Sequence, residues 1–174
     1  MKIFIDGSAG TTGLRIKDRL MKRSDVELTT LSEEQRKDTE SRKQALNSAQ
    51  VAFLCLPDAA AVESVELVEN PDTVIIDTST AHRTSEGWAY GFPELSAEFE
   101  DKIKNSKRIA VPGCHAGGFI ALVYPLVEAG VLGNDALLSC YSLTGYSGGG
   151  KKMIAEYESE DKSCLLYTSP SPRD

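Results

Sequence analysis

A cysteine stands where a predicted strand gives way to a predicted helix, in the segment VPGCHAGG around Cys114. The positive end of a helix dipole and its free N–H groups favour a thiolate, the nucleophilic form of the side chain. Gly113, Gly117 and Gly118 leave room beside the sulfur for a substrate and a nicotinamide ring. The pattern predicts a nucleophilic cysteine. A small buried residue at a turn is the alternative interpretation.

Three glycines in a G-x-x-G-x-x-G pattern follow the first predicted strand and open the first predicted helix. Glycines at such a junction permit a tight turn and a close approach of the backbone to a pyrophosphate. The spacing departs from the usual G-x-G-x-x-G, so the strand–turn–helix placement is the stronger part of the signal. We expect a dinucleotide site, with a plain glycine turn as the alternative. The expected cofactor-binding residues of this loop are Gly7, Ser8, Gly10, Thr11, Thr12 and Gly13.

The second predicted strand, over 26–30, lacks the terminal acid that usually binds the ribose of NAD. Hydroxyl and cationic side chains follow it instead, among them Ser32 and Arg36. These groups suit a 2′-phosphate better than a free diol, which predicts NADP(H). The alternative is a charged loop that only faces solvent.

Apolar runs alternate with helical patterns through the first half of the chain. Strands are predicted at 2–6, 26–30, 51–56 and 73–77, and helices over 11–23, around 44–47 and over 59–69. Unbroken apolar strands that alternate with helices indicate a parallel sheet covered on both faces. The predicted fold class is therefore α/β, with a Rossmann-like doubly wound parallel sheet.

Beyond residue 77 an irregular segment, 78–95, is followed by a charged helix-like stretch, and the apolar run 108–113 predicts a last strand of the sheet. A helix is expected from about 115 to Gly130, and a strand over 136–146 would open a second domain. The predicted organisation is an NADP-binding domain over 1–113, followed over 114–163 by the start of an incomplete α+β catalytic and dimerisation domain. Cys55 and Cys140 lie in apolar runs and are expected to be inert core residues.

The last eleven residues, CLLYTSPSPRD (164–174), carry neither a helical nor a strand period. The same string is obtained by translating one frame of a common sequencing adapter. We therefore expect 164–174 to be a non-native tail and the protein to be truncated after residue 163.

Composition and charge exclude several classes of protein. Nineteen basic against 26 acidic residues give a net charge of −7, which disfavours nucleic-acid binding. No apolar run approaches the roughly 18 residues of a membrane span. The four cysteines and two histidines show no metal-ligand spacing, so no metal site is predicted. We expect a cytoplasmic protein without nucleic-acid or membrane partners.

Five segments together resemble N-acetyl-gamma-glutamyl-phosphate reductase of the shorter bacterial type. They are IDGSAGTTGL, LCLPDAAA, DTSTAHRTSEGWAYGFPEL, VPGCHAGGFIALVYPL and TGYSGGGKKMI, in this order along residues 1–163. The resemblance implies an enzyme of arginine biosynthesis that uses NADPH to reduce N-acetyl-L-glutamyl 5-phosphate, a small-molecule acyl phosphate, to the 5-semialdehyde. It further implies a homo-oligomeric full-length protein of about twice this length.

The resemblance also implies roles for individual residues. Cys114 would be the nucleophile that forms a thioester, and Arg83 would bind the acyl phosphate or inorganic phosphate, with a purely structural arginine as the alternative. Ser79 and Thr80 would line the nicotinamide or phosphate region. A loop over the cofactor would include Ser147, Gly148 and Gly149, with a flexible interdomain turn as the alternative.

Some implications of the family fall outside this chain or depart from its pattern. The family's general base is a histidine of the second half, so neither His82 nor His115 is that group. Gly117 stands where the family often has threonine. The truncated chain itself is expected to be inactive. Two other functions stay open, namely a related aspartate-semialdehyde dehydrogenase and a nucleotide-binding module without catalysis.

Overall fold

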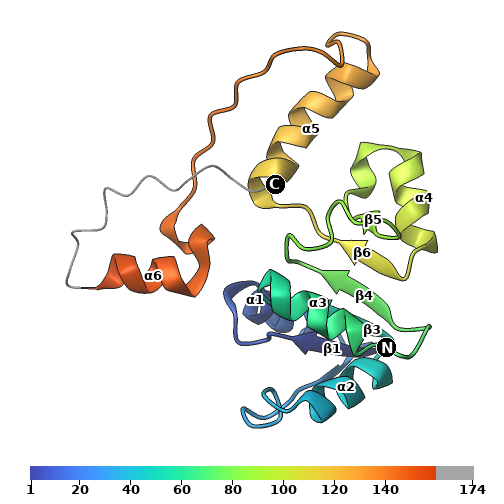
Figure 1. Cartoon of the computed structure of the whole chain (residues 1–174), viewed down its shortest axis with the longest axis vertical. Coiled ribbons are helices and arrows are strands. Elements are labelled where there is room, and N and C mark those ends of the chain that lie inside the picture. The colour runs from blue at the N-terminus through green and yellow to red at the C-terminus, as the bar shows by residue number, and fades with distance from the viewer. Residues whose placement is uncertain (160–174) are drawn as a thin grey trace.

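The computed structural model of the chain describes residues 1–159 (Figure 1), and the tail 164–174 lies outside them. The strands are β1 (Lys2–Asp6), β2 (Glu27–Thr29), β3 (Val51–Leu54), β4 (Val74–Asp77), β5 (Ala89–Tyr90) and β6 (Arg108–Ala110). The helices are α1 (Thr11–Leu20), α2 (Thr39–Ser48), α3 (Asp58–Glu66), α4 (Ala97–Asn105), α5 (Cys114–Glu128) and α6 (Gly150–Glu158), with 3-10 turns at Pro93–Leu95 and Tyr146–Gly149.

All six strands form one parallel sheet in the order β2-β1-β3-β4-β6-β5. The chain moves outward in one direction from β1 to β2 and in the other direction from β3 onward. Right-handed crossovers therefore place α1 on one face and α2 and α3 on the other. This confirms the predicted doubly wound fold. Ligands of such sheets bind beyond the carboxyl ends of the strands, where the direction reverses, which is here between β1 and β3.

The core lies between the central strands and the face that α2 and α3 cover. Its buried members are mostly alanines and branched apolar side chains: Phe4, Ala45, Leu46, Ala49, Ala52, Leu54, Ala61 and Ile75. The small residues of α2 let this helix approach the sheet closely. Asn47 supports the same face, because its amide donates to the Leu67 carbonyl at 2.9 Å and thereby joins α2 to the end of α3.

Three elements differ from the sequence-based expectation. Helix α2 begins at Thr39, well before the predicted 44–47, because the Asp38 carboxylate accepts from the Ser41 N–H at 2.8 Å and caps it. The two-residue strand β5 was not predicted, since so short a run shows no period. The predicted strand over 136–146 is wrong: no strand forms there in the described part of the chain.

Segment 136–145 instead has no regular secondary structure, and all of its residues are exposed. Leu137 is fully exposed, and Tyr141 and Leu143 are also exposed. Cys140 is exposed too, which corrects the expectation that it is a core residue. A strand forms only where neighbouring strands pair with its backbone, and its side chains are buried only where another layer covers them; the described residues provide neither for this segment.

Helix α5 projects away from the sheet (Figure 1). It confirms the predicted helix, which ends at Glu128. Gly130 follows the C-cap as expected, with φ +68°; its N–H bonds the Val127 carbonyl, and the N–H of Val131 bonds the Leu126 carbonyl. None of its residues is buried, although its sequence is largely apolar. No helix in the described part of the chain is long and apolar enough to cross a membrane.

Candidate active site

The glycine loop lies at the carboxyl end of β1, at the point where the sheet reverses direction. Gly7 has φ +84°, and a Cβ added there would stand 2.2 Å from the Cys55 carbonyl oxygen. A Cβ on Gly13 would stand 2.5 Å from the Gly7 oxygen. The Gly10 N–H closes the turn onto the Gly7 carbonyl at 3.0 Å. Only glycine fits at the two tight positions.

The loop leads directly into α1, and no side chain caps the N-terminus of this helix. The N–H groups of the first turn are therefore available to an anion, as a pyrophosphate site requires. The tight glycine turn and the uncapped N-terminus of α1 together fit the pyrophosphate of a dinucleotide.

Cys114 is the first residue of α5, and its side chain is exposed. It shares a cavity of about 490 Å³ with residues of the glycine loop, α1 and the 3-10 turn, namely Thr11, Thr12, Arg15, Ile16, Arg19, Ser147 and Gly148. The structure thus brings Cys114 together with four of the expected cofactor-binding residues, although Cys114 and Ser147 lie 33 positions apart in the sequence. Gly149 ends the same 3-10 turn.

Ser32 and Arg36 lie together in the turn after β2, whose end neighbours that of β1. The Arg36 Nε donates to the Ser32 carbonyl at 3.4 Å, and its Nη2 pairs with Glu33 at 3.7 Å. This turn and the glycine loop therefore lie at the same edge of the sheet. It does not line the cavity of Cys114.

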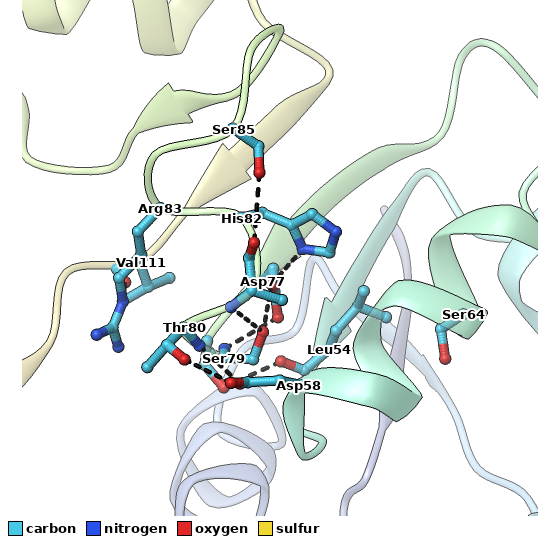
Figure 2. A network of polar contacts seen from close by, with 12 residues as sticks. Leu54, Asp58, Ser64, Asp77, Ser79, Thr80, His82, Arg83, Ser85 and Val111 are labelled. Carbon is cyan, nitrogen blue, oxygen red and sulfur yellow. Dashed lines mark hydrogen bonds and ion pairs between the residues drawn. The ribbon is translucent and has the colours of Figure 1, made fainter. Parts of the chain in front are cut away.

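Ser79 belongs to a buried polar network at the carboxyl end of β4 (Figure 2). The fully buried Asp77 accepts from the Ser79 hydroxyl at 2.6 Å and from the Ser79 N–H at 2.9 Å. His82 Nδ1 lies 2.7 Å from the same carboxylate, and its ring stacks on Trp88 at 4.1 Å between centroids. A carboxylate only accepts hydrogen bonds, so Nδ1 carries the hydrogen. The hydroxyl of Ser79 is thus directed at Asp77.

A second anchor ties the same loop to α3. Thr80 donates to Asp58 through both its hydroxyl, at 2.6 Å, and its N–H, at 3.0 Å (Figure 2). The hydrogen bond from the Thr80 hydroxyl is the main cause that lowers the pKa of Asp58. The loop 78–82 is therefore fixed at both ends.

Arg83 leaves this loop on the other side, where its Nε donates to the Val111 carbonyl at 3.0 Å (Figure 2). Arg83 lines a second cavity of about 630 Å³ with Thr80, Tyr90 and apolar side chains of α4 and α5. Val111 lies only three residues before Cys114, yet Arg83 is not among the residues that line the cavity of Cys114.

Several groups at the site were not found by sequence reasoning. Arg15 and Arg19 face the cavity of Cys114 from one side of α1, and their spacing of four residues could have indicated it. The contacts of Asp77 with His82 and of Asp58 with Thr80 depend on loop conformation and leave no periodic signal. Among the described residues, no cluster of three or more His, Cys, Asp or Glu side chains could hold a metal ion.

Cys55 directly follows β3, and its thiol should make the folding stability of the chain depend on pH. Burial raises the pKa of its thiol to about 11. Below about pH 8 this thiol is protonated in both the folded and the unfolded chain. At higher pH the Cys55 thiol loses its proton in the unfolded chain before it does so in the folded chain. The free energy of unfolding therefore falls as the pH rises to about 11. In denaturant unfolding, the wild type should lose more free energy of unfolding between pH 8 and pH 10.5 than Cys55→Ser does. Equal losses in the two proteins would contradict the assignment.

Comparison with known proteins identifies the family. The model of the family described as semialdehyde dehydrogenase, NAD binding domain, matches residues 2–105. N-acetyl-gamma-glutamyl-phosphate reductase of Chelativorans sp. (strain BNC1) is 54% identical over 157 residues, 90% of this chain and 51% of the relative. The reductase of the same name from Trichormus variabilis is 49% identical over 98% of this chain and 53% of its own length. The chain spans about half the length of the curated relatives it matches, and these relatives confirm the resemblance found in the sequence.

Solved structures with this fold are more distant in sequence. Aspartate semialdehyde dehydrogenase II of Vibrio cholerae matches with a TM-score of 0.63 and 16% identity, over 98% of this chain and 55% of that one. The aspartate semialdehyde dehydrogenase of Francisella tularensis matches with a TM-score of 0.59 and 20% identity, over 90% of this chain and 48% of that one. At such identity the likeness shows the fold alone. The sheet, the glycine loop and the family match agree: this chain belongs to the family of the semialdehyde dehydrogenase NAD-binding domain.

Proposed function

We propose that this chain is the cofactor-binding and nucleophile-bearing half of a cytoplasmic acyl-phosphate reductase that uses NADP(H). Its substrate would be N-acetyl-L-glutamyl 5-phosphate and its product the 5-semialdehyde, as the names of the relatives suggest. The observation that carries the proposal is the single cavity shared by Cys114 and the N-terminus of α1. The cofactor domain would span 1–113, and the catalytic domain would begin at Cys114.

The chemistry follows from the nucleophile. The Cys114 thiolate attacks the acyl carbon, the C–O bond to phosphate breaks, and a thioester forms while inorganic phosphate leaves. The nicotinamide cofactor, when bound, supplies the hydride that reduces this thioester. Reduction breaks the C–S bond, which releases the aldehyde and returns the thiolate to Cys114. The general base and the contacts between subunits would belong to the second half of the full-length protein.

The chain's own residues would hold the cofactor in two places. The pyrophosphate would bind the N–H groups of the glycine loop and of the first turn of α1. Ser32 and Arg36 would bind the 2′-phosphate, since a guanidinium and a hydroxyl suit this group. Ser79, Ser147, Gly148 and Gly149 would stand nearer to the nicotinamide.

Two measurements test this function. NADPH fluorescence titration of the chain should show saturable binding. A fusion of residues 1–159 to the part of the Chelativorans relative beyond the match, called the fusion enzyme below, should reduce N-acetylglutamyl phosphate. Binding without turnover by the fusion enzyme would favour a nucleotide-binding module. Turnover of aspartyl phosphate alone would favour the aspartate-semialdehyde dehydrogenase alternative.

Arg83 gives a prediction about the phosphate. Arg83→Ala in the fusion enzyme should raise KM for the acyl phosphate about tenfold or more, because a charge-assisted contact of about 1.5–3 kcal/mol is lost. The affinity for NADPH should stay unchanged. Lys102→Ala removes an exposed cation of α4 that pairs with Glu98 and serves as the control. An unchanged KM in Arg83→Ala would leave Arg83 with a structural role only.

A further inference from the structure

A buried ion pair lies directly behind the glycine loop. Asp6, the last residue of β1, accepts with one oxygen from Arg42 Nε at 3.2 Å and Nη2 at 3.1 Å. Ser64 of α3 donates to the same oxygen at 3.0 Å and accepts from Arg42 Nη2 at 2.5 Å. The side chains of Arg42 and Asp6 are 11% and 4% exposed. Arg42 Nη1 also reaches the exposed Glu63 carboxylate at 3.4 Å, but the Asp6–Arg42 pair itself is largely withdrawn from solvent and can act on a ligand only through its neighbours.

On one side, the pair continues into the loop expected to bind the pyrophosphate. Asp6 directly precedes Gly7, and its carbonyl accepts from the Cys55 N–H at 2.8 Å, which holds the end of β1 against β3. Asp6 is therefore held through both its carboxylate and its carbonyl, and the glycine loop begins at the next residue.

On the other side, backbone hydrogen bonds lead from Arg42 back to the turn expected to bind the 2′-phosphate. The Arg42 N–H donates to the Asp38 carbonyl at 3.1 Å, and the Asp38 N–H donates to the Gln35 carbonyl at 3.2 Å. The Arg36 N–H then donates to the Ser32 carbonyl at 3.0 Å. The turn 32–37 and the first turn of α2 therefore form one continuous hydrogen-bonded unit.

Besides Arg42, Lys43 forms an exposed ion pair with Glu69 at 2.6 Å, and two further contacts hold the opposite end of α2. Asn47 bonds the Leu67 carbonyl, and the Thr73 hydroxyl donates to the Ala49 carbonyl at 3.0 Å. Both contacts lie at the C-terminal end of the helix, away from the carboxyl edge of the sheet. Arg42 thus joins the N-terminal half of α2 to Asp6 of β1, and it also contacts α3.

We infer that Arg42 is a positioning residue that sets the placement of the Ser32–Arg36 turn relative to the glycine loop, and so the preference for NADPH over NADH. The inference rests on the proposed function, because it takes the turn as the 2′-phosphate site. NADH has no 2′-phosphate and does not need the turn. Displacement of the turn therefore weakens NADPH binding and leaves NADH binding nearly unchanged.

The experiment measures dissociation constants of the whole chain for NADPH and NADH, together with thermal stability. Arg42→Met leaves a carboxylate buried without its partner and can unfold the chain, so the double variant Asp6→Asn/Arg42→Met and the milder Ser64→Ala accompany it. Lys43→Met is the matched control, since the neighbouring residue of the same helix forms an exposed ion pair with Glu69 at 2.6 Å.

The expected result is a loss of NADPH affinity of about tenfold in the folded Arg42 variants, with NADH affinity within about twofold of the wild type. Lys43→Met should keep the wild-type ratio. An unchanged ratio in every folded variant, or an equal loss for both nucleotides, overturns the inference alone. If the wild type binds NADH and NADPH with equal affinity, the inference is overturned but the proposed reductase function is not. If the wild type binds neither nucleotide, the proposed function is overturned too.

Discussion

Cys114→Ser should abolish acyl-phosphate reduction by the fusion enzyme, with a fall in kcat of at least about a thousandfold. A hydroxyl is far less ionised than a thiol at neutral pH, and an alkoxide is a poor leaving group when the acyl intermediate must be reduced. Cys114 is the first residue of α5 and exposed to its cavity, so serine should be accommodated without loss of stability. The measurement is NADPH oxidation at saturating substrate, with NADPH affinity determined in parallel.

Cys140→Ser is the control for this experiment, because Cys140 is also exposed but lies in the irregular segment 136–145 and does not line the cavity of Cys114. It should leave kcat unchanged. Mass spectrometry after rapid mixing with the acyl phosphate, without cofactor, should show one acyl group on the wild type and none on Cys114→Ser. A Cys114→Ser enzyme with full activity would remove the nucleophile assignment, whatever the cofactor affinity.

The elements that position Cys114 were predictable because each carries a local signal. Buried parallel strands are unbroken apolar runs, and the glycines at 7, 10 and 13 occur at a strand end, so both could be located without neighbours. Cys114 itself follows such a run, in VPGC. Local pattern therefore predicted five of the six strands and the loop, with errors of a few residues at the strand ends.

The rest depends on contacts between distant residues, which no period encodes. Asp6 and Arg42 lie 36 positions apart, and Asp58 and Thr80 lie 22 apart. Arg83 could be placed after a strand, but which cavity it enters depends on its bond to Val111. The apolar run around Cys140 predicted a buried strand, because hydrophobicity alone does not say whether a partner strand is present.

Gly7→Ala should destabilise the chain by about 2–5 kcal/mol and prevent dinucleotide binding. Two costs add: the left-handed conformation of this residue, at φ +84°, costs about 1–2 kcal/mol with a Cβ, and forcing atoms into a packed site costs about 1–3 kcal/mol. The Cβ would stand 2.2 Å from the Cys55 carbonyl oxygen, which belongs to the neighbouring strand end and cannot turn aside like a side chain. Chemical denaturation and NADPH titration measure the two effects.

Two other glycines separate these costs. Gly87→Ala shares the left-handed backbone, at φ +79°, but has nothing within 4 Å of the added Cβ, so it should lose only the conformational part. Gly10→Ala lies in the same loop with the nearest atom at 3.5 Å, an ordinary contact, so its stability should fall by less than about 1 kcal/mol. If Gly10→Ala nevertheless loses NADPH affinity, the pyrophosphate requires that space itself. Should Gly7→Ala prove no less stable than Gly87→Ala, the close approach of Gly7 to β3 would not contribute to the fold.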